Sequence, residues 1–228
     1  MRRAAVLSLA AGAAFAAACS DIGGPGVPVG IEALVPVPAV IQLGDTIRLR
    51  ARAVDQNGDS VDAVIHWRTA DTTVALDSTT GLVSGRFTGS AKLQPLAGTL
   101  VGPMVTFSVT RRADTVVVDA AAESLFVAIA DSASAQLLPL VADSAGTGVA
   151  NVRLILTLVA PTDGSVLLPG AKLADTVTTS GAGTPAGVVL RKVSGPPPDS
   201  ALVEVEARRP SGAVVPGSGQ RIRVFFEQ

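Results

Sequence analysis

Residues 67–93 read WRTADTTVALDSTTGLVSGRFTGSAKL, and this stretch decides the fold. It holds the only tryptophan of the chain, Trp67, followed by short runs of apolar and β-branched residues that glycines interrupt. Gly81 is predicted to close a turn after residues 77–80, because glycine adopts backbone angles that other residues avoid. Gly89 is predicted to open the next strand after a sharp reversal. The pattern indicates short strands packed around one large aromatic side chain.

The segment before Trp67 alternates strictly between apolar and charged residues. Residues 46–55 read TIRLRARAVD, and in an extended strand every second residue lies on the same face. One face is Ile47, Leu49, Ala51 and Ala53, and the other is Arg48, Arg50 and Arg52. A helix cannot reproduce this period of two, so a half-buried strand is predicted. The arginine row is interpreted as the solvated face of an antiparallel sheet, with an anion-binding patch as the alternative.

A second strand is predicted over residues 64–69. Trp67 and Ile65 share one face of it, so Trp67 is expected to be the core anchor of a β-sandwich, with His66 towards solvent. His66 is the only histidine of the chain. A single histidine without a paired nucleophile or a second metal ligand is interpreted as structural.

The stretch around Trp67 resembles the group 2 bacterial immunoglobulin-like domain, a module of intimin-type adhesins and of many other bacterial surface proteins. The matching positions are Trp67, Asp71, Val74, Ala75, Asp77, Gly81, Val83, Gly89 and Ala91. The resemblance covers about residues 31–110 and implies an immunoglobulin-like β-sandwich that requires no disulfide. Leu82 and Val83, together with residues 91–93, are expected to face Trp67.

Residues 111–114 (RRAD) are predicted to be the seam between this domain and a second one. Strands separated by turn residues are then predicted over residues 115–120, 125–128, 136–142, 152–159, 175–180, 188–193, 202–208 and 221–226. Residues 152–159 are almost continuously apolar, which indicates a central strand or one buried on both faces.

Two segments of this second half resemble the group 1, invasin-type bacterial immunoglobulin-like domain. Residues 140–156 (LVADSAGTGVANVRLIL) match its Asp-x-x-Gly turn and central strand, and residues 179–190 (TSGAGTPAGVVL) match its later glycine turn. The likeness covers about residues 113–228. The chain is therefore predicted to be all-β, with two consecutive immunoglobulin-like β-sandwich domains after a cleaved signal peptide and a short linker.

The N-terminus has the composition of an export signal. Arg2 and Arg3 precede an uncharged stretch rich in Ala and Leu, so residues 1–18 are predicted to be a cleaved signal peptide. The stretch is shorter than the ~20 residues that a membrane-spanning helix needs. A twin-arginine export signal is an alternative, although the residues around the arginine pair depart from that motif.

Cys19 is the only cysteine, and it follows three alanines. It resembles the lipidated cysteine of bacterial lipoproteins, although that family prefers leucine where Ala16 stands. The alternative is ordinary cleavage, which would leave a free thiol in an exported protein. Residues 19–30 are predicted to be the lipidated cysteine and a flexible tether rich in Gly and Pro. By resemblance to the lipoprotein sorting rule, Ser20 after the cysteine implies the outer membrane.

Composition and spacing exclude several kinds of chemistry. The 18 basic and 19 acidic residues nearly cancel and no basic run follows the N-terminus, so nucleic acid is not an expected partner. Asp55, Asn57 and Asp59 begin like a calcium loop, but the glycine comes too early and His66 stands where a glutamate is needed. Glu204 and Glu206 are interpreted as a solvated strand face. A catalytic pair would lie across a cleft. No catalytic residue, metal or cofactor is expected.

The expected function is that of a non-catalytic, lipid-anchored cell-envelope protein that serves as a surface-displayed binding or spacer module, with adhesion as one use. Its expected partners are the membrane, through a lipid on Cys19, and a surface protein or glycan. One alternative is a carbohydrate-binding accessory protein, which the absence of Tyr and the single, core-forming Trp disfavour. Another is an enzyme of unrecognised type, which the absence of nucleophile and phosphate-binding motifs disfavours.

Overall fold

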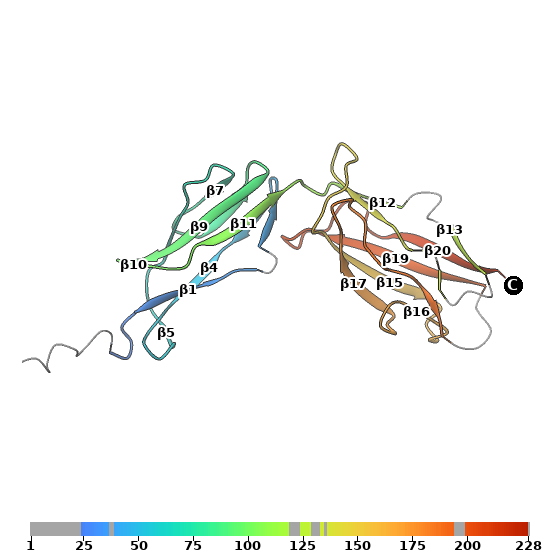
Figure 1. Cartoon of the computed structure of the whole chain (residues 1–228), viewed down its shortest axis with the longest axis horizontal. Coiled ribbons are helices and arrows are strands. Elements are labelled where there is room, and N and C mark those ends of the chain that lie inside the picture. The colour runs from blue at the N-terminus through green and yellow to red at the C-terminus, as the bar shows by residue number, and fades with distance from the viewer. Residues whose placement is uncertain are drawn as a thin grey trace, which may run out of the picture.

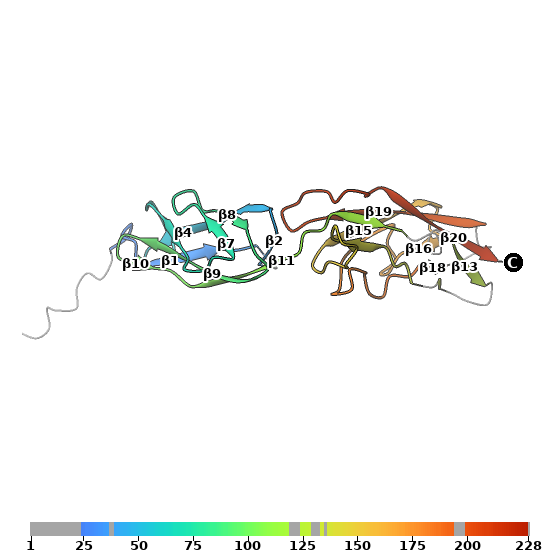
Figure 2. The same ribbon diagram turned by 90° about the horizontal axis from the view of Figure 1, so that it is seen from above.

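The computed structural model describes residues 24–36, 39–118, 124–128, 133–134, 136–193 and 199–227. Every regular element in these ranges is a β-strand. A helix long and apolar enough to cross a membrane is absent from this part of the chain. The strands form two immunoglobulin-like β-sandwiches that lie end to end (Figures 1 and 2), each around its own cluster of buried apolar residues. The predicted all-β fold class is confirmed.

The first domain is built from three sheets. One contains β1 (Gly30–Leu34), β4 (Arg50–Val54) and β5 (Ser60–Val61), in the order β1-β4-β5. The second has the order β10-β9-β11-β2, with β6 on β9; its strands are β10 (Leu100–Val101), β9 (Gly89–Ala97), β11 (Val105–Thr110), β2 (Val40–Gln42) and β6 (His66–Arg68). The third has the order β3-β8-β7, with β3 (Thr46–Arg48), β8 (Leu82–Gly85) and β7 (Val74–Leu76).

The alternating segment of the first domain forms two strands that belong to different sheets. β3 pairs with β8, and β4 pairs with β1, so the chain passes from one sheet to another at Leu49. Leu49 and Ala53 are buried, and the arginines of this segment face outward. Arg52 forms an ion pair with Glu32 at 2.7 Å on the exposed face. This face is solvated, as a half-buried strand requires.

The core of the first domain forms around Trp67, which is 4% exposed. Val83, Leu93 and Phe107 are fully buried in the same cluster. The expectation that Leu82 also faces this core is wrong, because Leu82 is 41% exposed. Successive side chains of a strand point to opposite faces, so when Val83 points inward, Leu82 points outward, opposite Arg48.

The second domain has a five-stranded sheet with the order β13-β20-β19-β15-β17. Its strands are β13 (Ser124–Ala128), β20 (Gln220–Glu227), β19 (Ser200–Arg208), β15 (Arg153–Ala160) and β17 (Ala174–Thr178). Two smaller sheets complete the domain: β12 (Thr115–Val117) with β14 (Leu140–Ala142), and β16 (Val166–Leu167) with β18 (Arg191–Lys192).

The strand predictions for the second domain hold with two differences. The segments predicted over residues 136–142 and 188–193 contain only the short strands β14 and β18, and β16 was not predicted. β15 is central, with β19 on one side and β17 on the other. It is buried on one face only, through Leu154, Leu156 and Leu158. A central position therefore accounts for its apolar sequence.

The N-terminal part of the described chain is hydrogen-bonded to the first domain. The amide of Gly26 donates to Asp55 Oδ2 at 3.2 Å, and the amide of Val29 donates to the Val54 carbonyl at 2.8 Å. Residue 30 already belongs to β1. Of the tether predicted over residues 19–30, the part from Gly26 onward is thus bonded to the domain. The predicted signal peptide and Cys19 lie outside the described residues.

Candidate functional site

The loop that begins like a calcium site is held by its own backbone. Asp55 is 5% exposed, and its Oδ1 accepts hydrogen bonds from the amides of Asn57 at 2.9 Å and Asp59 at 3.0 Å. Its Oδ2 accepts the bond from Gly26. The carboxylate is therefore occupied by N–H donors, an arrangement typical of an Asx turn. Within the described ranges, no group of three or more His, Cys, Asp or Glu side chains is placed to hold a metal ion.

Asp55 is expected to make the first domain sensitive to acid. The Gly26 amide is the main cause that lowers the pKa of Asp55 below its ordinary 3.8; burial opposes this, and the loop amides add to the lowering. A carboxyl whose folded-state pKa is lowered stabilises the fold above about pH 4, and this contribution is lost as the pH falls through the folded-state pKa. Asp55→Asn should therefore be less stable than the wild type at pH 7 but lose less additional stability on acidification.

Trp67 fluorescence during urea unfolding at several pH values measures this effect, because the only tryptophan lies in the first domain. Hydrogen exchange at the Gly26 amide should accelerate in Asp55→Asn, since one carboxylate oxygen becomes an NH2 donor. Asp62→Asn, on the exposed surface of the same domain, is the matched control. Equal pH dependence in Asp55→Asn and wild type would contradict the assignment.

Residues that resemble catalytic groups lie on solvated strand faces. His66 is exposed beside Arg68, whose guanidinium donates to Gln94 Oε1 at 2.6 Å. Glu204 pairs with Arg221 at 3.2 Å, and Glu206 pairs with Arg208, all on the outer face of the five-stranded sheet. Among the described side chains, Phe87 is the only aromatic that is largely exposed, at 63%. An aromatic strip of the kind that binds sugars is therefore absent from this part of the chain.

The glycines singled out around Trp67 hold tight backbone positions. Gly81 has a φ of 69°, and a Cβ there would lie 2.8 Å from the Leu49 carbonyl oxygen and 3.1 Å from Trp67 Nε1. Gly89 is the first residue of β9, with a φ of 147°. A Cβ at Gly89 would lie 3.2 Å from Thr73 Cγ2. Both positions restrict side chains by conformation and by space.

A cluster of buried polar groups lies where the two domains meet. Ala113, in the predicted seam, is fully buried. Its amide donates to Gln42 Oε1 of the first domain at 2.9 Å, and its carbonyl accepts from Arg209 Nε of the second domain at 2.9 Å. Gln42, the last residue of β2, is also fully buried. One linker residue is thus bonded to both domains.

Arg209 reaches the first domain from the tip of a hairpin. β19 and β20 extend towards the first domain (Figure 1), and the tip closes with bonds from Arg209 N to Ala213 O and from Gly212 N to Arg209 O. The Arg209 side chain is 7% exposed, and its Nη1 lies 3.5 Å from Asp45 Oδ1. Ser211 Oγ, in the same hairpin, donates to Asp45 Oδ2 at 2.7 Å. Asp45 belongs to the turn between β2 and β3, so both contacts cross the boundary.

The remaining seam residues are bonded as well. Arg111 pairs with Asp143 at 3.0 Å and donates to the Gly148 carbonyl at 2.8 Å. Arg112 lies 3.3 Å from Asp114, whose amide donates to the Ala142 carbonyl. Hydrogen bonding from the Thr147 amide is the main cause that lowers the pKa of Asp143, and Arg111 adds to it. The carboxylate that receives Arg111 is thereby kept charged.

We name Gln42, Asp45, Ala113, Arg209 and Ser211 the joint cluster. The sequence predicts a seam at residues 111–114 but not the partners of Ala113, because Gln42 and Arg209 lie 71 and 96 positions away from it. The only signal in the sequence is a charged residue, Arg209, directly after a strand and before a Pro-Ser-Gly turn. Such a signal indicates a hairpin but not what its tip contacts.

Comparison with known proteins gives similarity at the level of the fold. Neither a protein-family model nor a curated protein matches the chain. Among solved structures, the adhesin InvE of Yersinia pseudotuberculosis is 18% identical with a TM-score of 0.41, and the match covers 90% of this chain and 62% of the adhesin. The fibronectin(III)-like modules of Clostridium thermocellum CbhA are 13% identical with a TM-score of 0.41, covering 86% and 95%.

Domains 5–6 of the S-layer protein SbsC are 15% identical with a TM-score of 0.33, covering 89% of this chain and 99% of theirs. Identities and TM-scores this low concern the β-sandwich fold and carry no conclusion about function.

Proposed function

We propose that the protein is a lipid-anchored, non-catalytic spacer of the cell envelope that displays two immunoglobulin-like domains in line. The observation that carries this proposal is the path of the chain: it enters the first domain at one end and leaves the second at the opposite end (Figure 1). Because the two domains lie end to end, the second adds its length to that of the first, and a spacer needs such length. Domains folded back on each other would enclose a cleft between them.

The proposal includes anchoring through Cys19. Only residues 20–23 separate Cys19 from Gly24, where the described chain begins. Five peptide steps span at most about 18 Å, so a lipid on Cys19 would place the first domain close to the membrane surface. The anchored end would then be the end opposite the C-terminal strand β20. Assignment of the domains to groups 2 and 1 of the bacterial immunoglobulin-like modules, and sorting to the outer membrane, belong to the same proposal.

Replacing Cys19 by alanine is expected to release the protein from membranes. Acyl chains on the cysteine give a stable anchor, and the side chain of alanine cannot accept one. The measurement is fractionation of a bacterial host that expresses the full chain, with incorporation of labelled fatty acid as a second readout. The wild type should sediment with membranes and carry label, whereas Cys19→Ala should do neither.

Ser20→Ala is the control variant, since it changes the neighbouring residue and keeps the cysteine. Globomycin, which blocks processing of lipoprotein signals, should cause the precursor of the wild type to accumulate. Identical fractionation of Cys19→Ala and wild type would disprove the anchor.

A further inference from the structure

We propose that the joint cluster holds the two domains at one fixed angle, with Arg209 as its central residue. The inference deepens the proposed spacer function and rests on it for its biological meaning, but its physical content concerns the joint alone. Relative motion is the default for neighbouring domains unless their interface restrains them. The bonds at this joint restrain rotation of the linker.

The backbone of Ala113 is hydrogen-bonded to both domains. Its N–H is bonded to the first domain, through Gln42, and its C=O to the second, through Arg209. Rotation about the bonds of the linker would turn at least one of these groups away from its partner. Both groups are buried, so a lost bond would leave a buried polar group unsatisfied.

Asp45 and Arg209 add a restraint away from the linker. One oxygen of the Asp45 carboxylate pairs with Arg209, and the other accepts a hydrogen bond from Ser211. These two contacts fix both the position and the rotation of the hairpin tip. The side chains of Asp45 and Arg209 are only 9% and 7% exposed. A charge pair this far out of water is screened little by salt, and removing one partner leaves the other buried and uncompensated. Loss of Arg209 would leave Asp45 as a buried charge without its partner, which favours separation of the hairpin tip from the first domain.

The other ion pairs at the boundary cannot do the same. Arg111 and Arg112 are 44% and 47% exposed, and their carboxylate partners, Asp143 and Asp114, lie in the second domain or in the seam itself. Exposed pairs contribute little. The Asp114 side chain, which is 34% exposed, lies 3.9 Å from Arg209, so Arg209 also contacts the linker. The restraint between the domains is thus concentrated on Arg209.

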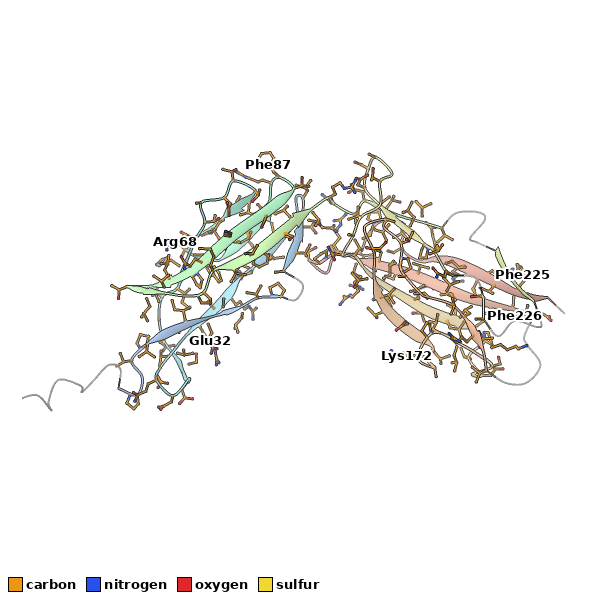
Figure 3. The ribbon with its side chains drawn as sticks, viewed as in Figure 1. Glu32, Arg68, Phe87, Lys172, Phe225 and Phe226 are labelled. Atoms are coloured by element: carbon orange, nitrogen blue, oxygen red, sulfur yellow. The ribbon has the colours of Figure 1, made fainter. Side chains whose placement is uncertain are left out.

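Double electron–electron resonance tests the proposal on the full chain. Cys19→Ala removes the only native thiol, and Phe87→Cys and Lys172→Cys place one spin label on the surface of each domain (Figure 3). We expect one narrow distance distribution for this parent protein and the same distribution in high salt. Arg209→Ala should broaden the distribution at least about twofold, because unrestrained domains sample many angles.

Arg208→Ala is the matched control. It removes the adjacent arginine, whose partners Glu206 and the Gly212 carbonyl belong to its own domain. Its distribution should equal that of the parent protein. Asp45→Asn removes the negative charge on the first-domain side of the joint cluster with little change in side-chain shape. It should also broaden the distance distribution. Far-UV circular dichroism and Trp67 fluorescence verify that each variant is folded.

A broad distribution in the parent protein would overturn the proposal, as would folded Arg209→Ala and Asp45→Asn proteins that keep the narrow one. Neither result would affect the anchor, which depends on membrane fractionation of the chain that retains Cys19. Conversely, release of wild-type protein from membranes would remove the anchored spacer but leave the fixed angle intact.

Discussion

Replacing Gly183 by alanine is expected to prevent the second domain from folding stably. Gly183 has a φ of 80°, and a Cβ at this position would lie 2.3 Å from the Val141 carbonyl oxygen and 2.6 Å from Gly148 Cα. Real Cβ atoms essentially never approach other heavy atoms below 3.0 Å. The obstructing atoms are backbone, so no rotamer change relieves the contact. Overpacking and left-handed strain together predict a loss of about 2–5 kcal/mol, a large part of the stability of a small domain.

Gly148 shows why the neighbourhood cannot adjust. A Cβ at Gly148 would lie 2.0 Å from the Ala182 carbonyl oxygen, so two glycine-containing segments, far apart in sequence, pass each other in direct backbone contact. The Val141 amide donates to the Gly183 carbonyl at 2.9 Å, and Arg111 of the seam donates to the Gly148 carbonyl. Separating the segments would break bonds inside the second domain and at its boundary.

Gly181→Ala is the control, two residues away. A Cβ at Gly181 meets nothing within 4 Å and its φ is not positive, so the change should cost less than about 1 kcal/mol. Hydrogen exchange measured segment by segment should show rapid exchange in β15 and β19 for Gly183→Ala only. Trp67 fluorescence should show that the first domain remains folded. If both variants protect β15 and β19 equally, the backbone contact is not tight.

The features that the sequence predicted are those set by neighbours in the chain. The alternation over residues 46–55 depends only on the period of a strand, and burial of Leu49 and Ala53 follows from it. Turn-forming residues in the sequence indicated where most strands of the second domain begin and end. The prediction of a seam at residues 111–114 likewise depends on neighbouring residues, because predicted strands resume directly after RRAD.

What the sequence could not predict depends on partners distant in the chain. Residues 179–190 resembled a family's glycine turn, but nothing local indicated that Gly183 would meet Gly148. The two residues of β16 are too few to show a period, and they form a strand only because β18 lies beside them. Arg209 gave no sign of its contact with Asp45, 164 positions earlier, since a charged hairpin tip is equally compatible with solvent.

Truncation of Trp67 is expected to have the largest effect on the first domain. The indole is 4% exposed and contributes to the cluster that contains Val83, Leu93 and Phe107. Replacing a buried aromatic side chain of this size by alanine removes its transfer free energy and leaves a cavity, which together cost about 3–5 kcal/mol. The large neighbours Leu93 and Phe107 are themselves fully buried in this cluster, so neither can refill the space without leaving a gap of its own.

Trp67→Phe should cost less, since a smaller aromatic ring fills part of the same volume, and His66→Ala should cost almost nothing because that side chain is exposed on the opposite face. Both Trp67 variants lose the fluorescence probe, so exchange protection in β9 and β11 is the measurement for all three variants. If Trp67→Ala were as well protected as His66→Ala, the indole would not organise this core. The expected order of stability has Trp67→Ala lowest, Trp67→Phe intermediate and the wild type highest. This order follows from the volume that the indole fills beside Gly81. There the glycine leaves just enough room for it, because a Cβ would lie 3.1 Å from Nε1.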